Sequence, residues 1–318
     1  MAVNLGEAVV ATARRYLPTM TDNITADNSL LRFLRDKGKI EVYDGGGRQI
    51  GEPLLYNESG NTSVAWFEGY ETFTPQTAWD ILDAATYDWR QMAGLITIST
   101  REEKINRGEQ EQIKLIKSRI EATQNIMSNT LATALYNTGT NAKAIAGLGH
   151  LVQDDPTTAS TVGGIPQATS TNSWWRNYTS GSVTITSSNI VAKLNAAFLN
   201  IKRGMEVPDL YVASTDLYDV YEQALQSLQR ITTADKADAG YGSLMYKQKP
   251  FVHDDVCTAK RIYCLNTKFL KLRKMDQEMF EVGDARQVTN AFYKVIPVSM
   301  MGQLTTNRRA AHGVIIDD

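Results

Sequence analysis

The sequence predicts an α+β fold, and three stretches of the chain carry that prediction. Residues 109–137 repeat apolar side chains at the spacing of one long helix. Residues 189–230 alternate helix, strand and helix patterns, which is typical of an α/β unit. The last ~60 residues are rich in short apolar runs that favour strands. A length of 318 residues allows one large domain or two intergrown domains.

The composition is that of a globular protein, with 42% hydrophobic and 21% charged residues. A formal net charge of -2 provides no basic field to recruit nucleic acid by counterion release, so tight DNA binding by a monomer is not expected. Cys257 and Cys264 fit neither a redox pair nor a zinc knuckle, which favours synthesis in a reducing cytoplasm. Neither a secretion signal nor a membrane span is expected.

The N-terminal third predicts an arm, a hairpin and a short helix. Residues 1–38 do not form a self-sufficient unit. Residues 41–70, "EVYDGGGRQIGEPLLYNESGNTSVAWFEGY", predict a long hairpin with strand-forming arms around a glycine-rich middle. Thr74 can cap a helix that begins at Pro75, and Trp79, Leu82 and Trp89 then fall near one face of it. A short strand is expected over Gly94–Ser99.

The clearest signal is the helix over 109–137, which at about 1.5 Å per residue would be ~40 Å long. Gly139 is expected to end it. The apolar positions are Ile113, Ile116, Ile120, Met127, Leu131 and Leu135.

Residues 139–188 are rich in Gly, Thr and Ser and predict a long connection with buried anchors. A helix is then expected over 189–203, with an apolar stripe of Val191, Leu194, Phe198 and Ile201. "PDLYVAS" predicts a buried strand and 215–230 a second helix. Further strands are expected in "KPFVHD", "KRIYCLN" and "KFLKLRK", and a final pair in "FYKVIPVSMMGQLTT" and "AAHGVIID".

The sequence offers only weak support for a catalytic, phosphate-binding or metal-binding site. A helix N-terminus does not follow the glycine run Gly45–Gly51, so a hairpin turn is favoured over a phosphate cradle. His253, Asp254 and Asp255 form a His/carboxylate cluster, but no second histidine is near, so a metal site is disfavoured. The cysteines are interpreted as core residues. No catalytic residue, cofactor or metal is expected, and the protein is not expected to be an enzyme.

Paired tryptophans in "NSWWRN" leave two interpretations open. Trp174 and Trp175 could stack on a sugar or a base. They could instead pin the long connection to the core while Arg176 bonds to backbone carbonyls, and anchoring is preferred because large aromatic side chains bury enough area to do so.

The order of these elements resembles the major capsid proteins of tailed bacteriophages, which share the Hong Kong-ninety-seven-type fold. Three stretches strengthen the resemblance: "YDWRQMAGLITISTREEKINRG" before the long helix, "GGIPQATSTNSWWRN" after it, and "YKVIPVSMMGQL" near the end. The resemblance implies an N-terminal arm over 1–38 and an extended loop over 39–74. It also implies a peripheral domain with the spine helix over 75–140, an α/β axial domain over 141–285, and return strands of the peripheral domain over 286–318.

The resemblance implies that the function of the protein is to associate with other copies of itself. Copies would tile as pentamers and hexamers into an icosahedral shell around the double-stranded DNA genome of a phage, made in the cytoplasm of its bacterial host. Expected partners are other copies, a separate scaffold or decoration protein, a portal, and DNA through weak contacts; no membrane is involved. The alternatives are an encapsulin-like compartment and a glycan-binding adhesive module.

The resemblance also assigns roles to residues. The extended loop would contact neighbouring subunits because its strands carry apolar groups on both faces, with Trp66 and Tyr70 on one side and Phe67 and Phe73 on the other. Since no lysine lies between Lys39 and Lys104, cross-linking by a loop lysine is not expected. The inter-subunit residues would be Tyr43, Arg48, Trp66, Phe67, Tyr70 and Phe73, and the loop at the capsomer centre would present Asp235, Lys236, Asp238 and Tyr241.

Overall fold

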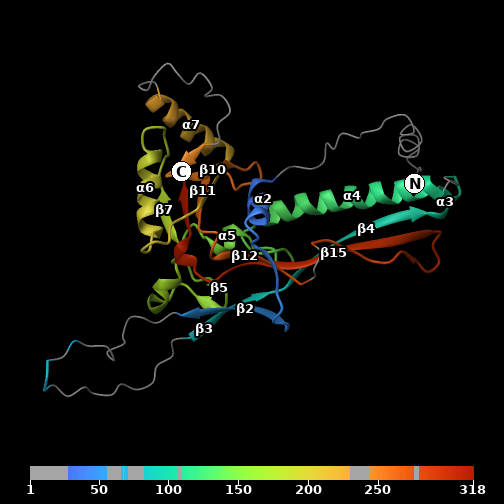
Figure 1. The fold of residues 1–318 in the computed structure, drawn as a ribbon, viewed down its shortest axis with the longest axis horizontal. Helices are drawn as coiled ribbons and strands as arrows, with labels where there is room; N and C mark the ends of the chain where they lie inside the picture. The colour runs from blue at the N-terminus through green and yellow to red at the C-terminus, as the bar shows by residue number, and fades with distance from the viewer. Residues whose placement is uncertain are drawn as a thin grey trace.

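The computed structural model describes residues 28–55, 66, 68–70, 82–105, 109–229, 244–275 and 279–318. Most of the arm expected over 1–38 therefore lies outside the described residues. Figure 1 shows an elongated molecule with two regions. One contains a long helix and a long strand pair, and these extend from the other, which is built of a sheet and two helices.

The long helix is confirmed. Helix α4 spans Glu109–Ala134 and follows the short helix α3, Thr100–Ile105. It lies along strands β4, Arg90–Ser99, and β15, Tyr293–Thr306 (Figure 1). A Cβ added at Gly94 would lie 2.8 Å from Thr123 Cγ2, so the glycine permits this close approach of helix and sheet. The helix ends before Gly139, because Tyr136 N donates to Thr133 O and tightens the last turn.

The first sheet is organised around β15. Its order is β1-β12-β15-β13, and β14 and β4 also pair with β15. Strand β4 is antiparallel to β15 from Ser99 opposite Tyr293 to Arg90 opposite Gly302, and β12 pairs with the rest of β15. The remaining strands are β1, Ile40–Val42; β12, Leu270–Lys274; β13, Glu281–Val282; and β14, Arg286–Gln287.

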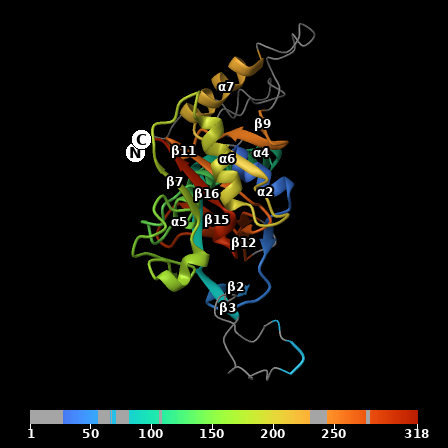
Figure 2. The ribbon, with the colours of Figure 1, turned by 90° about the vertical axis from the view of Figure 1, so that its left-hand side faces the viewer.

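The second sheet has the order β7-β16-β11-β8-β10-β9. Its strands are β7, Tyr178–Ser182; β8, Leu210–Ala213; β9, Met245–Tyr246; β10, Lys249–His253; β11, Arg261–Leu265; and β16, Gly313–Ile316. The strand and helix predictions over 189–274 are confirmed, with α6 at Ile190–Ile201 and α7 at Thr215–Gln229. Figure 2 views the molecule from the side on which these helices lie.

The second sheet separates two cores because side chains of a strand alternate between its faces. Tyr211 and Ile262 belong to the core under α6 and α7. Val212 and Tyr263, one residue further along each strand, belong to the core that also contains α4 and the first sheet. The near-continuous apolar runs of β8 and β11 are therefore explained by burial on both faces.

Three expectations are wrong in detail. Residues 82–88 form strand β3, not part of a helix, because Ala85 and Tyr87 alternate inward with period two. The last two strands do not pair: β16 joins β11 and β7 of the second sheet, so the assignment of all of 286–318 to the peripheral domain fails for Gly313–Ile316. In α6, Val191 is 36% exposed, and the inward stripe is Ile190, Leu194, Ala197 and Ile201.

Helix α2, Ser29–Asp36, is held against the second sheet by a buried carboxylate. Asp254, just after β10, accepts hydrogen bonds from Asn28 Nδ2 at 3.0 Å and Tyr136 Oη at 2.7 Å. Leu30 N and Val256 N also donate to it. The carboxylate is surrounded by N–H and O–H donors and joins α2, the end of α4 and β10.

The remaining elements are short. They are α5, Leu148–Leu151; β5, Thr161–Val162; β6, Ile165–Pro166; and the 3₁₀ turns η2, Ser170–Trp175, and η3, Arg309–Ala311.

Within the described part of the chain, no helix combines the length and apolar character needed to cross a membrane.

Candidate functional site

A two-stranded hairpin leaves the body of the molecule below the first sheet (Figure 1). Strand β2, Gln49–Leu55, is antiparallel to β3, Leu82–Asp88, with Gln49 opposite Asp88 and Leu55 opposite Leu82. The hairpin arms therefore lie at 49–55 and 82–88, and the expected loop boundary at residue 74 lies outside the described residues. The glycine run precedes β2 as a turn, in which Gly46 and Gly47 have positive φ.

One face of the hairpin is buried against the first sheet. Ile50 and Leu54 of β2 and Ala85 of β3 belong to the first core. Glu52 lies between the two apolar residues of β2 on the same face and is 4% exposed. A carboxylate at a core-facing position must be compensated, since an unpaired buried charge is costly.

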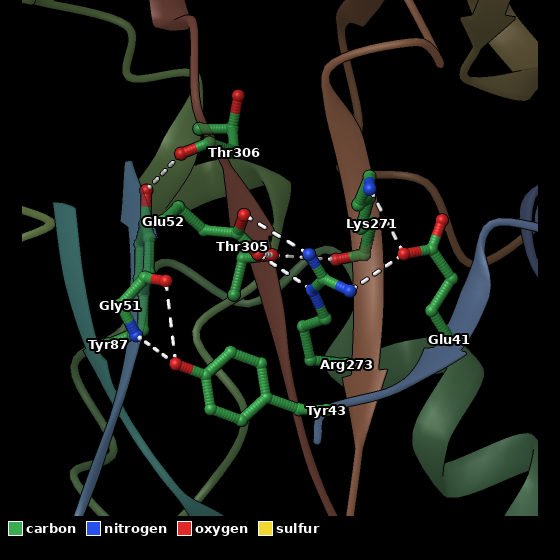
Figure 3. Close-up of polar contacts among 9 residues, drawn as sticks. All are labelled: Glu41, Tyr43, Gly51, Glu52, Tyr87, Lys271, Arg273, Thr305 and Thr306. Atoms are coloured by element: carbon green, nitrogen blue, oxygen red, sulfur yellow. Dashed lines mark hydrogen bonds and ion pairs between the residues drawn. The ribbon is translucent and has the colours of Figure 1, made fainter. Parts of the chain in front are cut away.

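Arg273 of β12 supplies the compensation. Its Nε donates to Glu52 Oε1 at 2.7 Å and its Nη2 to Glu52 Oε2 at 3.2 Å, a bidentate pair. Thr305 Oγ1 of β15 donates to Glu52 Oε1 at 3.1 Å. The hydrogen bond to Glu52 raises the pKa of Arg273 above its ordinary value. The pair joins the hairpin to two strands of the first sheet (Figure 3).

The same guanidinium continues the network toward β1. Arg273 Nη1 donates to Glu41 Oε2 at 2.7 Å, and Lys271 Nζ donates to that oxygen at 3.0 Å. Glu41 and Arg273 are direct neighbours in the parallel pairing of β1 with β12. Two carboxylates and two cations thus link β1, β12 and β2 (Figure 3).

Two tyrosines complete the base of the hairpin. Tyr87 Oη of β3 donates to Thr306 O at 2.7 Å, and burial raises its pKa well above the ordinary value. Tyr43 Oη accepts from Gly51 N at 3.1 Å, and the Tyr43 ring packs edge-on against Trp89 with centroids 5.9 Å apart. We call this set the hairpin root: Glu41, Tyr43, Gly51, Glu52, Tyr87, Lys271, Arg273, Thr305 and Thr306 (Figure 3).

The "GGI" turn also contacts the hairpin. Gly163 O accepts from Thr86 N at 2.9 Å. Gly163 and Gly164 have φ of 63° and 78°, and a Cβ at Gly163 would lie 2.9 Å from Ala85 Cβ. Glycine is required here both by backbone conformation and by the close approach to β3.

Among the predicted loop residues, only Tyr43 belongs to the hairpin root. Arg48 is exposed in the turn before β2. Trp66 and Tyr70 are fully exposed, at 103% and 105%. Phe67 and Phe73 lie outside the described residues, as do the capsomer-loop residues Asp235, Lys236, Asp238 and Tyr241. The alternation expected for Trp66 to Phe73 therefore stays a prediction.

The long connection is held by Trp175 and Arg176. Trp175 is 1% exposed and donates from Nε1 to Val162 O at 2.9 Å, with the Trp174 ring 5.5 Å away by centroid. Arg176 Nε donates to Gln167 O at 2.9 Å, and its Nη2 donates to Ala168 O at 3.0 Å. Because Trp175 is buried, the two tryptophans cannot present a joint stacking platform for a sugar or a base.

Arg309 is a second, unpredicted anchor of this connection. Its guanidinium is fully buried and donates to Leu151 O, Gln167 Oε1 and Asn177 Oδ1 at 2.7, 2.8 and 2.9 Å. Burial lowers the pKa of Arg309 to about 10. His312 follows in the same crossover between sheets, where Nδ1 accepts from Asn266 N at 3.3 Å and Nε2 lies 3.1 Å from Thr306 Oγ1.

The cysteine and histidine candidates have no exposed nucleophile or ligand geometry. Cys257 and Cys264 are buried, and burial raises the pKa of Cys257 to about 12. His253 Nε2 lies 3.0 Å from Thr215 Oγ1, whereas Asp254 points into the joint with α2 and α4. Among the described residues, no group of three or more His, Cys, Asp and Glu could hold a metal ion.

Sequence reasoning missed Glu52, Arg273 and Arg309. A local signal existed for Glu52, because it interrupts the inward apolar series Ile50-x-Glu52-x-Leu54. A charged residue at an inward strand position implies a buried partner. That partner, Arg273, is 221 residues away, and no local pattern could identify it.

Neither the protein-family models nor the curated proteins match the sequence. Solved structures do match the fold. The capsid asymmetric unit of cyanophage A-1(L) aligns with a TM-score of 0.62 at 16% identity, over 95% of this chain and 97% of that chain. The capsid of a native GTA particle aligns with a TM-score of 0.57 at 14% identity, over 98% of both chains.

The holo-SrpI encapsulin complex from Synechococcus elongatus PCC 7942 also aligns, with a TM-score of 0.57 at 11% identity, over 96% of this chain and 94% of that chain. These alignments run from end to end of both partners and include phage capsid and encapsulin chains. The chain therefore has the α+β fold of tailed-phage capsid proteins and encapsulins, as the sequence resemblance implied.

Proposed function

We propose that this chain is the major capsid protein of a tailed bacteriophage and assembles as pentamers and hexamers into an icosahedral shell around double-stranded DNA. The observation that carries the proposal is an end-to-end fold match to capsid chains, at 95% and 97% coverage for the cyanophage protein. Its function is association rather than catalysis. It is made in the host cytoplasm and resides in the virion capsid.

The hairpin is suited to contact a neighbouring subunit. Its root is fixed to the first sheet by the pair of buried Glu52 with half-buried Arg273 and by Tyr87. Beyond the root, Trp66 and Tyr70 are fully exposed in a single chain. Large aromatic side chains bury about 150–250 Å² each when they are covered. A neighbouring subunit that covers Trp66 and Tyr70 therefore gains substantial binding energy. A rigid root directs that contact, and the absence of lysine from 40–103 leaves packing and hydrogen bonds to hold it.

The other partners follow from the same function. A separate scaffold or decoration protein and a portal would complete the assembly. Contact with packaged DNA would be weak and sequence-independent, because a chain of net charge -2 has no dominant positive field. Such weak contact lets DNA move as it is packed.

An encapsulin-like compartment is the second candidate, favoured by the TM-score of 0.57 with the encapsulin chain. The contents of the shell separate the two candidates. Shells that protect DNA from nuclease support the capsid function, whereas shells that enclose a co-expressed enzyme and no nucleic acid support the compartment. A glycan-binding module is disfavoured, since Trp175 is buried.

The test is removal of the hairpin beyond its root. Replacement of residues 56–81 by Asn-Gly joins Leu55 to Leu82, which are already opposite each other, through a two-residue turn that suits a hairpin. A deletion over 45–61 is less suitable, because it would remove Ile50, Glu52 and Leu54 from the core. We expect the shortened chain to fold but not to form closed shells.

The measurements are circular dichroism for folding, and light scattering with negative-stain microscopy for assembly. The full-length chain is expected to form megadalton shells. A full-length chain that stays monomeric under all conditions would overturn the proposed function. Normal shells from the shortened chain would instead overturn the role of the hairpin.

A further inference from the structure

We propose that the outer edge of strand β4 pairs with the same edge of a second copy of this chain, antiparallel and across a two-fold axis. The pairing would join the first sheets of two subunits into one continuous sheet. This inference rests on the proposed function, because a closed icosahedral shell has two-fold axes at which identical subunits meet.

The first sheet has two edges where β4 and β15 run together. Val298 of β15 lies opposite Gly94 of β4 on one side and opposite Val282 of β13 on the other. Among the described strands, β4 is therefore the edge on one side of β15, and the short strands β13 and β14 are the edge on the other. Each edge carries backbone N–H and C=O groups that can pair with a further strand.

The residue after β4 shows which backbone groups of this strand bond toward β15. Thr100 N donates to Phe292 O, which directly precedes β15, at 3.0 Å. The N–H and C=O groups of one residue point to the same edge of an antiparallel strand, and this direction alternates along the strand. Even-numbered residues of β4 therefore bond toward β15, and odd-numbered residues direct their backbone groups to the outer edge.

Two further bonds agree with this direction and occupy one end of the outer edge. Thr97 O accepts from Arg119 Nη1 at 2.8 Å, and Ser99 N donates to Glu102 Oε2 at 3.2 Å. Arg119 and Glu102 also form an ion pair at 3.0 Å. The outer edge is thus closed from Thr97 onward by side chains of α3 and α4.

The rest of the outer edge is unpaired. We call Gln91, Ala93 and Leu95 the open edge. Among the described residues, none forms a hydrogen bond with the outward N–H and C=O groups of these three. All three residues are exposed, and Leu95 is 68% exposed. Arg90, at the start of β4, is the single charged residue of this strand, which contains no proline.

The opposite edge of the same sheet is protected against pairing. Strands β13 and β14 have two residues each, and the segment 281–286 carries Glu281, Asp284 and Arg286. Short strands and charged side chains are the devices by which proteins keep sheet edges from pairing. Strand β4 is ten residues long and has no charge in its open edge. The contrast indicates that β4 receives a further strand.

A second copy is the partner that the open edge fits. Antiparallel strands related by a two-fold axis offer each other the same spacing of N–H and C=O groups, so the open edge is complementary to itself. Ala93 is its centre. An axis at Ala93 places Leu95 opposite Gln91 of the second copy and Ala93 opposite its counterpart, without bringing a charge into the contact. Pairing with the β13 and β14 edge would instead meet the charges that protect it.

The faces of the sheet also suit a two-fold axis perpendicular to it. Helix α4 packs on one face, where a Cβ at Gly94 would lie 2.8 Å from Thr123 Cγ2 and where Ile96 and Ile98 are buried. Side chains of the open edge point to the other face, because they alternate with these residues. A perpendicular axis keeps both copies of α4 on the same side of the joined sheet. The wall of a shell, which has an inner and an outer surface, requires such an arrangement.

Ala93→Cys tests the pairing and its register in assembled shells. The two Cα atoms of a hydrogen-bonded antiparallel pair are about 5.5 Å apart, within the range that a disulfide spans. After oxidation with copper phenanthroline, we expect most chains to run as dimers on a non-reducing gel. Cys257 and Cys264 are buried and do not compete.

Thr97→Cys is the matched control for the disulfide. Thr97 is exposed on the same strand and the same face as Ala93. In the proposed register, the two Thr97 residues are about 27 Å apart, at about 3.4 Å per residue. We therefore expect no disulfide dimer from Thr97→Cys shells under the same oxidation.

Ala93→Pro tests whether assembly needs the pairing. Proline lacks the N–H that would bond to the second copy, and it is tolerated on an edge strand where that group points outward. We expect a folded subunit by circular dichroism and about a tenfold or greater loss of shells by sedimentation, since the contact repeats at every two-fold axis. Thr97→Pro removes an outward N–H that lies beyond the open edge, so it is the control and should assemble like the native chain.

Native shells are the reference for all these variants, and a native chain that forms none overturns the proposed function itself. Where native shells form, three results would overturn the pairing: no disulfide dimer in Ala93→Cys shells, equal dimer formation in Thr97→Cys shells, or normal assembly of folded Ala93→Pro. Loss of assembly in Ala93→Pro without a dimer in Ala93→Cys would mean that another strand occupies the edge, which also overturns the pairing with a second copy. If Ala93→Pro does not fold, the two cysteine variants decide.

Discussion

Two arginines, half-buried Arg273 and fully buried Arg309, fix two different parts of this molecule, and they are compensated in different ways. Arg273 at the hairpin root meets the carboxylates of Glu52 and Glu41, and its pKa is raised. Arg309 at the long connection donates to neutral oxygens of Leu151, Gln167 and Asn177, and burial lowers its pKa to about 10. The first is an ion-pair network between strands, and the second is a hydrogen-bonded cation that gathers loop segments.

The difference reflects what each part contributes to the core. The hairpin root buries few side chains, and a bidentate pair adds directional bonds that set the exit angle of the strands. The connection already has buried Trp175 and Val162. Arg309 bonds there to residues of three separate segments of the chain, through one backbone oxygen and two side-chain oxygens, so its role is to fix their relative positions.

The largest expected effect is from Arg273→Met. This change leaves the carboxylate of Glu52 buried without its cation, which costs about 3–5 kcal/mol of unfolding free energy. Urea denaturation of the unassembled subunit measures it. The double variant Glu52→Leu, Arg273→Met is the matched control and is expected to lose less than Arg273→Met alone. Equal losses would mean that the pair is not the source of the effect.

Arg309→Met should cost less, about 2–3 kcal/mol, because its oxygen partners lose a charged donor while a buried charge is also removed. The same denaturation experiment measures this loss. Arg308→Met, on the neighbouring and partly exposed arginine, is the control and should change stability by less than about 0.5 kcal/mol. A loss larger than that of Arg273→Met would reverse the proposed difference between the two sites.

His312, beside Arg309, predicts a pH dependence. Burial lowers its folded pKa to about 3, whereas an unfolded histidine titrates near ~6.5. The unfolded state therefore binds more protons between these values. Its contribution is complete above about pH 6.5 and is lost as the pH falls, by ~1.4 kcal/mol per pH unit until about pH 3. In His312→Gln, unfolding free energy measured between pH 6 and pH 4 should show a shallower slope; an unchanged slope would contradict the assignment.

The smallest effect is expected at the edge of the hairpin root. Lys271 and Glu41 form an ion pair with side chains 27% and 34% exposed, so solvent screens it. Lys271→Ala should cost less than about 1 kcal/mol, and the cost should fall further in high salt. Denaturation at low and high ionic strength checks both statements. A cost close to that of Arg273→Met would show that the network cannot be divided.

The sequence by itself determined the elements whose signal is local. Helices α4, α6 and α7 and strands β8, β10, β11 and β12 were predictable because periodic side chains reveal which face is buried. The glycines of the "GGI" turn could be recognised in the same way, since their backbone conformation is a local requirement. The resemblance to capsid proteins also rested on this order of elements.

Only the tertiary structure decided the rest. Residues 82–88 form a strand because β2 and the first sheet accept them, although Trp79, Leu82 and Trp89 also fit a helical face. Strand β16 joins the second sheet because its partners, β11 and β7, are far away in the chain. Glu52 finds Arg273, and Arg309 finds Gln167, across separations of 221 and 142 residues. Local pattern encodes the need for burial, whereas the identity of the partner depends on the packing of the whole chain.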